Sequence, residues 1–360
     1  MTTAARTPWW AWAWPLSAWA IIGIIAVAGA TGAIALLAGA VLIATVFAAV
    51  YHAEVVAHRI GEPFGTLVLA VAVTVIEVAL IVSIMVGFAA DKTGLARDTV
   101  FAAVMIVCNG IVGACLLLGG MRHHEQGFQL QGASAALAVL AALTVLTLIV
   151  PNFTTTTPGP AFSRPQLVFA GVVSLVLYGS FVFVQTVRHR DYFLPLPAGS
   201  HELHALPPDN RVALISAALL ALALIAIVVL AKSLTPALEG IVAFVGAPKA
   251  VVGIAIALLV LLPEGLAALR AAAANRLQTS LNLALGSALA SIGLTIPTVA
   301  LVSILLGQPL DLGLGVKDMV LLALTLLVGV ITLGTGRTTV LQGIVHLVIF
   351  ATFLFLAVVP

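Results

Sequence analysis

The chain has 360 residues, of which 62% are hydrophobic and 8% are charged, and its mean hydropathy is +1.24. Apolar runs of about 20 residues, the length of a helix that crosses a bilayer, recur along the chain and exclude a soluble globular protein. The runs do not alternate apolar and polar residues, which excludes a transmembrane β-barrel. The net charge of +2 is small and dispersed, which excludes nucleic acid as a partner. The composition predicts an all-α polytopic membrane protein whose partners are small inorganic ions and lipid.

The apolar runs predict about eleven transmembrane helices. In chain order they cover residues 9–29, 33–52, 63–88, 99–120, 133–151, 166–186, 211–231, 249–270, 280–306, 318–334 and 338–358. The first run begins with four tryptophans between residues 9 and 14, which is typical of a helix anchored at the membrane interface. Nine of the lysines and arginines fall on the side of the N-terminus and six on the other side. The positive-inside rule therefore predicts a cytoplasmic N-terminus and an external C-terminus.

The longest polar stretch, residues 187–210, is predicted to be a cytoplasmic linker. It separates two blocks of five predicted helices, residues 33–186 and 211–360, and residues 1–32 form an extra N-terminal helix. Because each block has an odd number of helices, the second should cross the membrane upside down relative to the first. Inverted repeats of this kind are typical of secondary transporters.

Short sequence matches support the predicted repeat. The segments EVVAHRIGEP at 54–63 and EGIVAFVGAP at 239–248 share Glu, Gly and Pro, each 185 residues later in the second segment. Glu264 follows Glu77 by 187 residues, which is close to the same register.

Glu77 and Glu264 lie deep inside apolar runs, each about 14 or 15 residues into its predicted helix. At 1.5 Å of rise per residue, both are expected near the middle of the bilayer. A charged side chain there costs roughly 2.5–3.5 kcal/mol on insertion scales, so such residues mark ion or proton pathways. The two glutamates are therefore predicted to bind both a cation and protons. The alternative is a protonated carboxyl that only hydrogen-bonds a neighbouring helix.

Polar residues at matching depth are predicted to supply further oxygen ligands. Asn109 and Ser291 lie mid-span in the helices that follow the two glutamate helices, and Thr74 lies one turn before Glu77. Because no thiolate or imidazole is expected at this depth, the ligand set favours a hard cation. Interhelical hydrogen bonding is the alternative role for Asn109 and Ser291.

Glu54 and His58 share one helix face next to the predicted cytoplasmic mouth of the Glu77 helix. Histidine is suited to proton relay, so this pair is predicted to couple proton movement or to attract cations, with a solvated interface as the alternative. His346 is the one histidine expected within a span. A passive cation channel and an intramembrane enzyme with Glu77 and Glu264 as a carboxyl dyad are the alternatives from other functional classes.

Four stretches of the sequence are distinctive as a set. They are GEPFGTLVLAVAVTVIEVALIV at 61–82, RDTVFAAVMIVCNGIVGACLLLGGMRH at 97–123, LLPEGLAALRAAAANRLQTSLNLALGSALASIGLTIP at 261–297 and GRTTVLQGIVHLVIF at 336–350. Together they resemble the bacterial calcium/proton antiporters of the cation/Ca²⁺ exchanger superfamily. The resemblance implies a protein of the bacterial inner membrane, with a ten-helix core of two inverted repeats and one acidic helix from each repeat at a central cation site.

The resemblance matches Glu77 and Glu264 to the family's ion-binding glutamates, and Asn109 and Ser291 to neighbouring site positions. In sodium/calcium exchangers the position of Ser291 is often acidic, so this chain has fewer carboxylates. The implied function is secondary active export of Ca²⁺ in exchange for protons by alternating access. A Na⁺/H⁺ or K⁺/H⁺ antiporter of the same fold is the alternative, and neither enzymatic activity nor a resident cofactor is expected.

Overall fold

The computed structural model describes residues 7–30, 32–61, 72, 74–79, 81–82, 93–194, 208–245, 248 and 250–359. Nearly all of these residues are helical, and two short strands form the only sheet among them. The chain divides into two compact units, Met1–Gly87 with His201–Val252, and Phe88–Ser200 with Gly253–Pro360. Each unit combines segments from both halves of the sequence, and each is described by itself.

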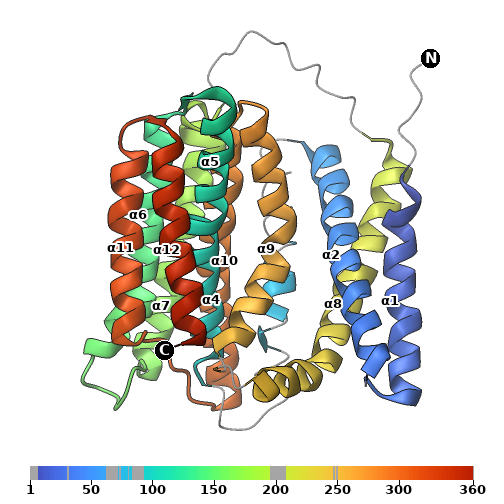
Figure 1. The fold of residues 1–360 in the computed structure, drawn as a ribbon. Coiled ribbons are helices and arrows are strands. Elements are labelled where there is room, and N and C mark those ends of the chain that lie inside the picture. Colours follow the sequence, from blue (N-terminus) through green and yellow to red (C-terminus); the bar gives the residue numbers. More distant parts are fainter. Residues whose placement is uncertain are drawn as a thin grey trace, which may run out of the picture. The chain divides into compact units, whose positions relative to one another are not determined.

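Three long helices belong to the first unit: α1 (Trp9–Ala28), α2 (Gly32–Ile60) and α8 (Asn210–Val245). Helix α2 packs along α8, and α1 contacts both of them, as Figure 1 shows for the blue and yellow helices. Pro15 inside α1 has no N–H, so the carbonyl of Ala11, one turn earlier, lacks its helical donor. The Nε2 atom of the buried His52 on α2 lies 2.9 Å from this carbonyl oxygen. The proline therefore exposes an acceptor that ties α1 to α2.

Two further hydrogen bonds hold α1 in the first unit. The hydroxyl of Thr45 on α2 shares its proton between the Val41 carbonyl of its own helix, at 2.7 Å, and the carbonyl of Trp14, at 3.3 Å. The indole N–H of Trp19 donates to the carbonyl of Leu222 on α8 at 3.3 Å. The extra N-terminal helix is thus bonded to both long helices of its unit.

The second unit is built around one continuous span, formed by α4 (Leu95–Met105), the π-helical turn η1 (Ile106–Ile111) and α5 (Val112–His123). The other described helices of this unit are α6 (Leu130–Thr144), η2 (Val145–Ile149), η3 (Val150–Phe153), α7 (Arg164–Phe183), η4 (Val184–Arg188), η5 (Arg190–Tyr192), α9 (Ala250–Ala273), α10 (Leu277–Leu306), α11 (Val316–Leu333) and α12 (Val340–Val358). Helices α10 and α12 pack directly on the continuous span, and every residue of α4 except Arg97 and Asp98 is buried. This span is the core of the unit.

Glycines let α12 approach α5 closely. A Cβ atom on Gly343 of α12 would lie 2.4 Å from the backbone nitrogen of Leu117, and one on Gly113 of α5 would lie 2.9 Å from Cβ of His346. The strands β1 (Gln126–Gly127) and β2 (Arg337–Thr338), which follow α5 and precede α12, pair antiparallel. These contacts decide which residues of the two helices face each other.

The fold class predicted from the sequence is confirmed. Ten helices among the described residues are long and apolar enough to cross a membrane, and most begin and end within a few residues of the predicted spans. The expected span at 63–88 falls largely outside the described residues. Helices α2 and α8 are the exceptions. Helix α2 continues to Ile60, which makes Glu54 and His58 helical, and α8 continues to Val245, well beyond the predicted end at residue 231.

The longer α2 also overturns the expectation that His346 is the one histidine within a span. His52 is the last residue of the predicted span, but α2 continues eight residues beyond it, and His52 is fully buried inside the helix. Of the predicted linker at 187–210, residues 195–207 lie outside the described residues. The linker, the repeat boundaries and the sidedness of the termini stay predictions.

Gly343→Ala should destabilise the protein, because overpacking a well-packed contact costs about 1–3 kcal/mol. Gly179→Ala on α7 is the matched control, since nothing lies within 4 Å of the Cβ atom it would add, and alanine is favoured over glycine in a helix by roughly 0.5–1 kcal/mol. Thermal unfolding in detergent should show a lower midpoint for Gly343→Ala and an equal or higher one for Gly179→Ala. Equal midpoints for the two variants would contradict the close approach of α5 and α12.

Candidate cation site

Asn109 lies in the π-helical turn η1, at the middle of the central span of the second unit. Its side chain is fully buried. The amide nitrogen Nδ2 donates to Oγ1 of Thr325 on α11 at 2.9 Å, and the amide oxygen Oδ1 lies 3.1 Å from Nδ1 of His346 on α12. A π-helical turn often marks a functional position, because its extra residue rotates side chains away from the ordinary helical register. Here that turn carries the amide that joins three spans.

His346 extends these contacts into a buried hydrogen-bonded group. Its Nε2 atom lies 3.1 Å from Oγ1 of Thr332 on α11, and the hydroxyl of Thr325 donates to the carbonyl of Leu321 at 2.8 Å. Asn109, Thr325, Thr332 and His346 are between 0% and 3% exposed. We call these four side chains the Asn109 cluster.

Sequence reasoning selected Asn109 but missed Thr325 and Thr332. Its expectation that no imidazole lies at the depth of Asn109 was wrong, because His346 contacts the Asn109 amide directly. All are polar residues within apolar spans, so their depth is a signal that could have selected them. Their pairing could not be predicted, because the segment IVCNGI gives no periodic indication that η1 is π-helical.

Glu264 lies on α9, and both of its carboxylate oxygens are shielded from solvent although the residue as a whole is half-buried. The preceding Pro263 lies inside the helix and has no N–H, which leaves the carbonyl one turn earlier without its helical donor. A Cβ atom on Gly265 would lie 3.1 Å from Cδ1 of Ile111 in η1. The residue after Glu264 therefore packs on the π-helical turn that carries Asn109.

Ser291 and Thr295 lie one turn apart on α10, which packs on α4, η1 and α5. Their exposed fractions are 2% and 0%. The hydroxyl of Thr295 is buried and has no hydrogen-bond partner among the described residues, an arrangement that costs about 1–3 kcal/mol. Thr295 is therefore a further candidate oxygen ligand beside Ser291.

Glu77 and Thr74 belong to the first unit, where they lie in the helical residues 74–79 and are 3% and 4% exposed. Glu54 and His58 are exposed near the end of α2, as both a vestibule and a solvated interface require. Glu77 and Glu264 lie in different units, and each is described within its own unit. Their convergence on one cation stays a prediction.

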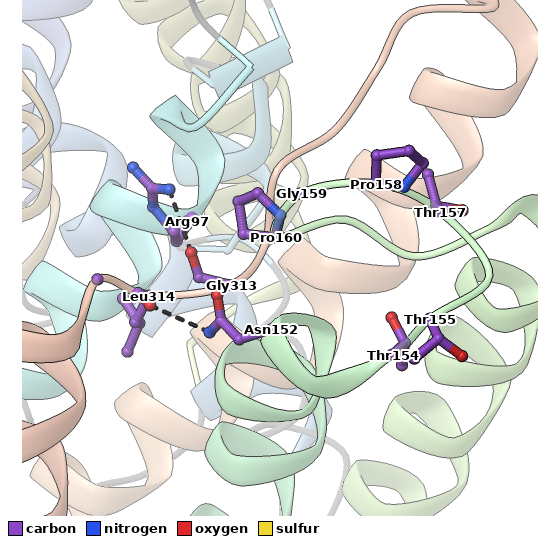
Figure 2. A pocket seen from close by; sticks show the side chains of 11 residues that line it. Arg97, Asn152, Thr154, Thr155, Thr157, Pro158, Gly159, Pro160, Gly313 and Leu314 are labelled. Carbon is purple, nitrogen blue, oxygen red and sulfur yellow. Dashed lines mark hydrogen bonds between the residues drawn. The ribbon is translucent and has the colours of Figure 1, made fainter.

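An open cavity of about 620 Å³ lies in the second unit, at the end where α4 begins (Figure 2). Its lining includes Arg97, Asn152 and three threonines but no carboxylate. Figure 2 shows Arg97 bonded to the carbonyl of Gly313, at 3.2 Å, and Asn152 bonded to the carbonyl of Leu314, at 3.0 Å. This cavity offers a cation no anionic ligand, so it is not the candidate cation site.

Apolar spans that hold carboxylates and amides in their interior define a polytopic helical membrane transporter. The same fold occurs in solved calcium/proton exchangers. The chain matches the Ca²⁺/H⁺ antiporter YfkE with a TM-score of 0.72 and 16% identity, over 97% of this chain and 100% of that chain. It matches the H⁺/Ca²⁺ exchanger CAX with a TM-score of 0.71 and 14% identity, over 95% and 87% of the two chains. Identities this low show the fold alone.

Residues 30–187 and 215–359 match the model of the sodium/calcium exchanger protein family, and the chain belongs to this family. It is 52% identical to y4hA of Sinorhizobium fredii, an ionic transporter by name, over 99% of this chain and 98% of that protein. It is 38% identical to the sodium-potassium/proton antiporter ChaA of Escherichia coli, over 89% and 88%. The Ca²⁺/H⁺ antiporter of Aphanothece halophytica is 24% identical over 77% and 79%. The family match begins at residue 30, after α1.

Asn109→Ala should destabilise the protein, because Thr325 and His346 each lose a buried partner, and a buried polar group left unpaired costs about 1–3 kcal/mol. The double variant Asn109→Ala/Thr325→Val should lose less stability than the two single variants combined, since the bond between them can be lost only once. Thermal unfolding of all three variants checks this prediction. Strictly additive losses would show that Asn109 and Thr325 do not interact.

Proposed function

We propose that this protein is a secondary active cation/proton antiporter that exports Ca²⁺ in exchange for H⁺ by alternating access. The observation that carries the proposal is one acidic residue in each structural unit, Glu77 and Glu264, whose carboxylates are shielded within apolar helices. Protons and cations neutralise the same charge, so they compete for the same carboxylate oxygens. Membership of the sodium/calcium exchanger family and the antiporter names of two relatives support this function.

Obligatory exchange follows from the charge of two carboxylates at one site. One Ca²⁺ or two protons neutralise them, whereas the bare pair is costly to hold in hydrocarbon. If the helices change the exposed side of the site only in a neutral state, cation movement in one direction requires proton movement in the other. Thr74, Asn109 and Ser291 supply neutral oxygens, which tune coordination without carrying exchanged charge.

A Na⁺/H⁺ or K⁺/H⁺ antiporter is the second candidate. The relative named as a sodium-potassium/proton antiporter is 38% identical, whereas the one named as a Ca²⁺/H⁺ antiporter is 24% identical. Ser291 is uncharged, and fewer carboxylates favour a monovalent over a divalent cation. Parallel flux assays for Ca²⁺, Na⁺ and K⁺ on one vesicle preparation, with and without a pH gradient, decide between the candidates. Cation flux that is not accompanied by opposite proton movement would indicate a passive channel instead.

We place the protein in the bacterial inner membrane with its N-terminus in the cytoplasm, following the distribution of lysine and arginine. In that orientation the proton gradient drives the cation out of the cytoplasm. Glu54 and His58, exposed near the end of α2, then lie at the cytoplasmic entrance, where they attract cations or exchange protons with water. The mechanism uses neither a resident cofactor nor an enzymatic step.

Glu77→Gln and Glu264→Gln should each abolish cation-driven proton movement while the protein stays folded. Glutamine keeps the size and hydrogen bonding of glutamate but lacks the charge that both ions need. Exchange is measured in reconstituted vesicles, with thermal unfolding as the control for folding. Wild-type exchange in either variant would remove that glutamate from the site.

Acidification should inhibit cation uptake competitively on the same side of the membrane. Protons that titrate Glu77 and Glu264 remove cation ligands, so a higher cation concentration should restore the rate. Initial rates across cation concentrations at neutral and mildly acidic pH should show a raised half-saturation concentration and an unchanged maximal rate. A lowered maximal rate with unchanged half-saturation would place the inhibiting proton at a separate group such as His58.

A further inference from the structure

The donor and the acceptor of each hydrogen bond in the Asn109 cluster can be assigned. The hydroxyl of Thr325 has a single proton, and its two acceptors are the carbonyl of Leu321 at 2.8 Å and the sulfur of Met105 at 3.4 Å. The carbonyl is the nearer and stronger acceptor, so it takes the proton. Its oxygen can then only accept from Asn109, so Nδ2 of the amide, 2.9 Å away, faces Thr325. The amide oxygen of Asn109 consequently faces His346.

This direction determines which imidazole nitrogen carries the proton. Oδ1 of Asn109 has no hydrogen, so Nδ1 of His346, 3.1 Å away, must be the donor. In a neutral imidazole Nε2 is then the acceptor, and the hydroxyl of Thr332 donates to it at 3.1 Å. One unbroken series of donated hydrogen bonds therefore runs from Thr332 through His346, Asn109 and Thr325 to the carbonyl of Leu321.

Burial holds this direction in place. The four side chains are at most 3% exposed, so water does not compete for their hydrogen bonds. A reversed Asn109 amide would place its carbonyl oxygen against the oxygen of Thr325, whose proton is donated to the Leu321 carbonyl, and an unmade buried hydrogen bond costs about 1–3 kcal/mol.

Two features of the central span allow His346 to reach Asn109. The π-helical turn η1 turns Asn109 toward α11 and α12. On the facing helix, Gly113 has no Cβ atom, and one added there would lie 2.9 Å from Cβ of His346. If position 346 served packing alone, an apolar side chain would suffice and would need no acceptor on Asn109. The hydrogen bond between His346 and Asn109 therefore indicates that His346 has a role beyond packing.

We propose that His346 is a positioning residue of the cation site, which holds the amide oxygen of Asn109 in the orientation that serves the transported cation. An amide oxygen has two lone pairs, and His346 takes one of them. Groups that orient a metal ligand in this way contribute roughly 10- to 100-fold to metal affinity. Thr332 acts one step further away by keeping the proton of His346 on Nδ1. This inference rests on the proposed function, in which the amide oxygen of Asn109 is a ligand of the transported cation.

Three substitutions test the proposal in the flux assay. His346→Leu removes the donor to Asn109 and should raise the half-saturating concentration of the transported cation roughly 10- to 100-fold, with a smaller effect on the maximal rate. His346→Asn places an amide N–H at the position of Nδ1–H and should restore the affinity. Thr332→Val should raise half-saturation less than His346→Leu. Thr352→Val is the matched control, because Thr352 is exposed on α12 and donates to the Val348 carbonyl of its own helix.

Wild-type half-saturation in His346→Leu, or equal impairment of His346→Asn and His346→Leu, would overturn the proposal. Equal kinetics of Thr332→Val and Thr352→Val would overturn the role of Thr332, and this comparison stands even if His346→Leu does not fold.

The tautomer gives a readout that does not depend on transport. Nitrogen-15 spectra of histidine-labelled protein in lipid, compared with those of His346→Asn, assign the signals of His346. They should show a protonated Nδ1 in the wild type and a mixture of tautomers in Thr332→Val. An Nε2–H tautomer in the wild type would overturn the proposal. If Glu264→Gln still exchanged cations, the proposed function would fail, while this spectroscopic result would be unaffected.

Discussion

A polar group inside an apolar span must find its hydrogen-bond partner within the protein, because hydrocarbon offers none. In the second unit this requirement selects one arrangement for the Asn109 cluster, in which each donor meets an acceptor from Thr332 to Leu321. The cluster joins the central span to α11 and α12 at fixed register. The arrangement of the candidate site therefore depends on the same bonds that hold three helices together.

Residues or turns that weaken a regular α-helix occur where the polar contacts are made. Pro15 leaves the Ala11 carbonyl for His52, the π-helical turn η1 carries Asn109, and Gly113 leaves space beside His346. Each of these features lowers the stability of its own helix and is offset by a contact between helices. In a membrane, where apolar burial does not distinguish one helix partner from another, such contacts specify which helices pair.

The first unit contains a helix, α1, that lies outside the family match. The family match covers most of the chain but begins after α1, and α1 is bonded to α2 and to α8. The two glutamates of the proposed cation site belong to different units, Glu77 to the first and Glu264 to the second. An exchanger needs the charged groups of its site to be able to move relative to one another between two states, and a division of the carboxylates between two compact units is compatible with that need.

Hydropathy and charge alone determined the membrane class and the ten observed spans, because transfer into hydrocarbon acts on each segment separately. They could not determine that α2 continues to Ile60, since a helix end at the interface leaves no strong hydropathy signal. Only the tertiary structure decided that Asn109 bonds to Thr325 and His346, which are 216 and 237 residues away in the sequence. The physical reason is that these bonds depend on a π-helical offset and on glycine contacts between helices, and neither leaves a periodic pattern in the sequence of one span.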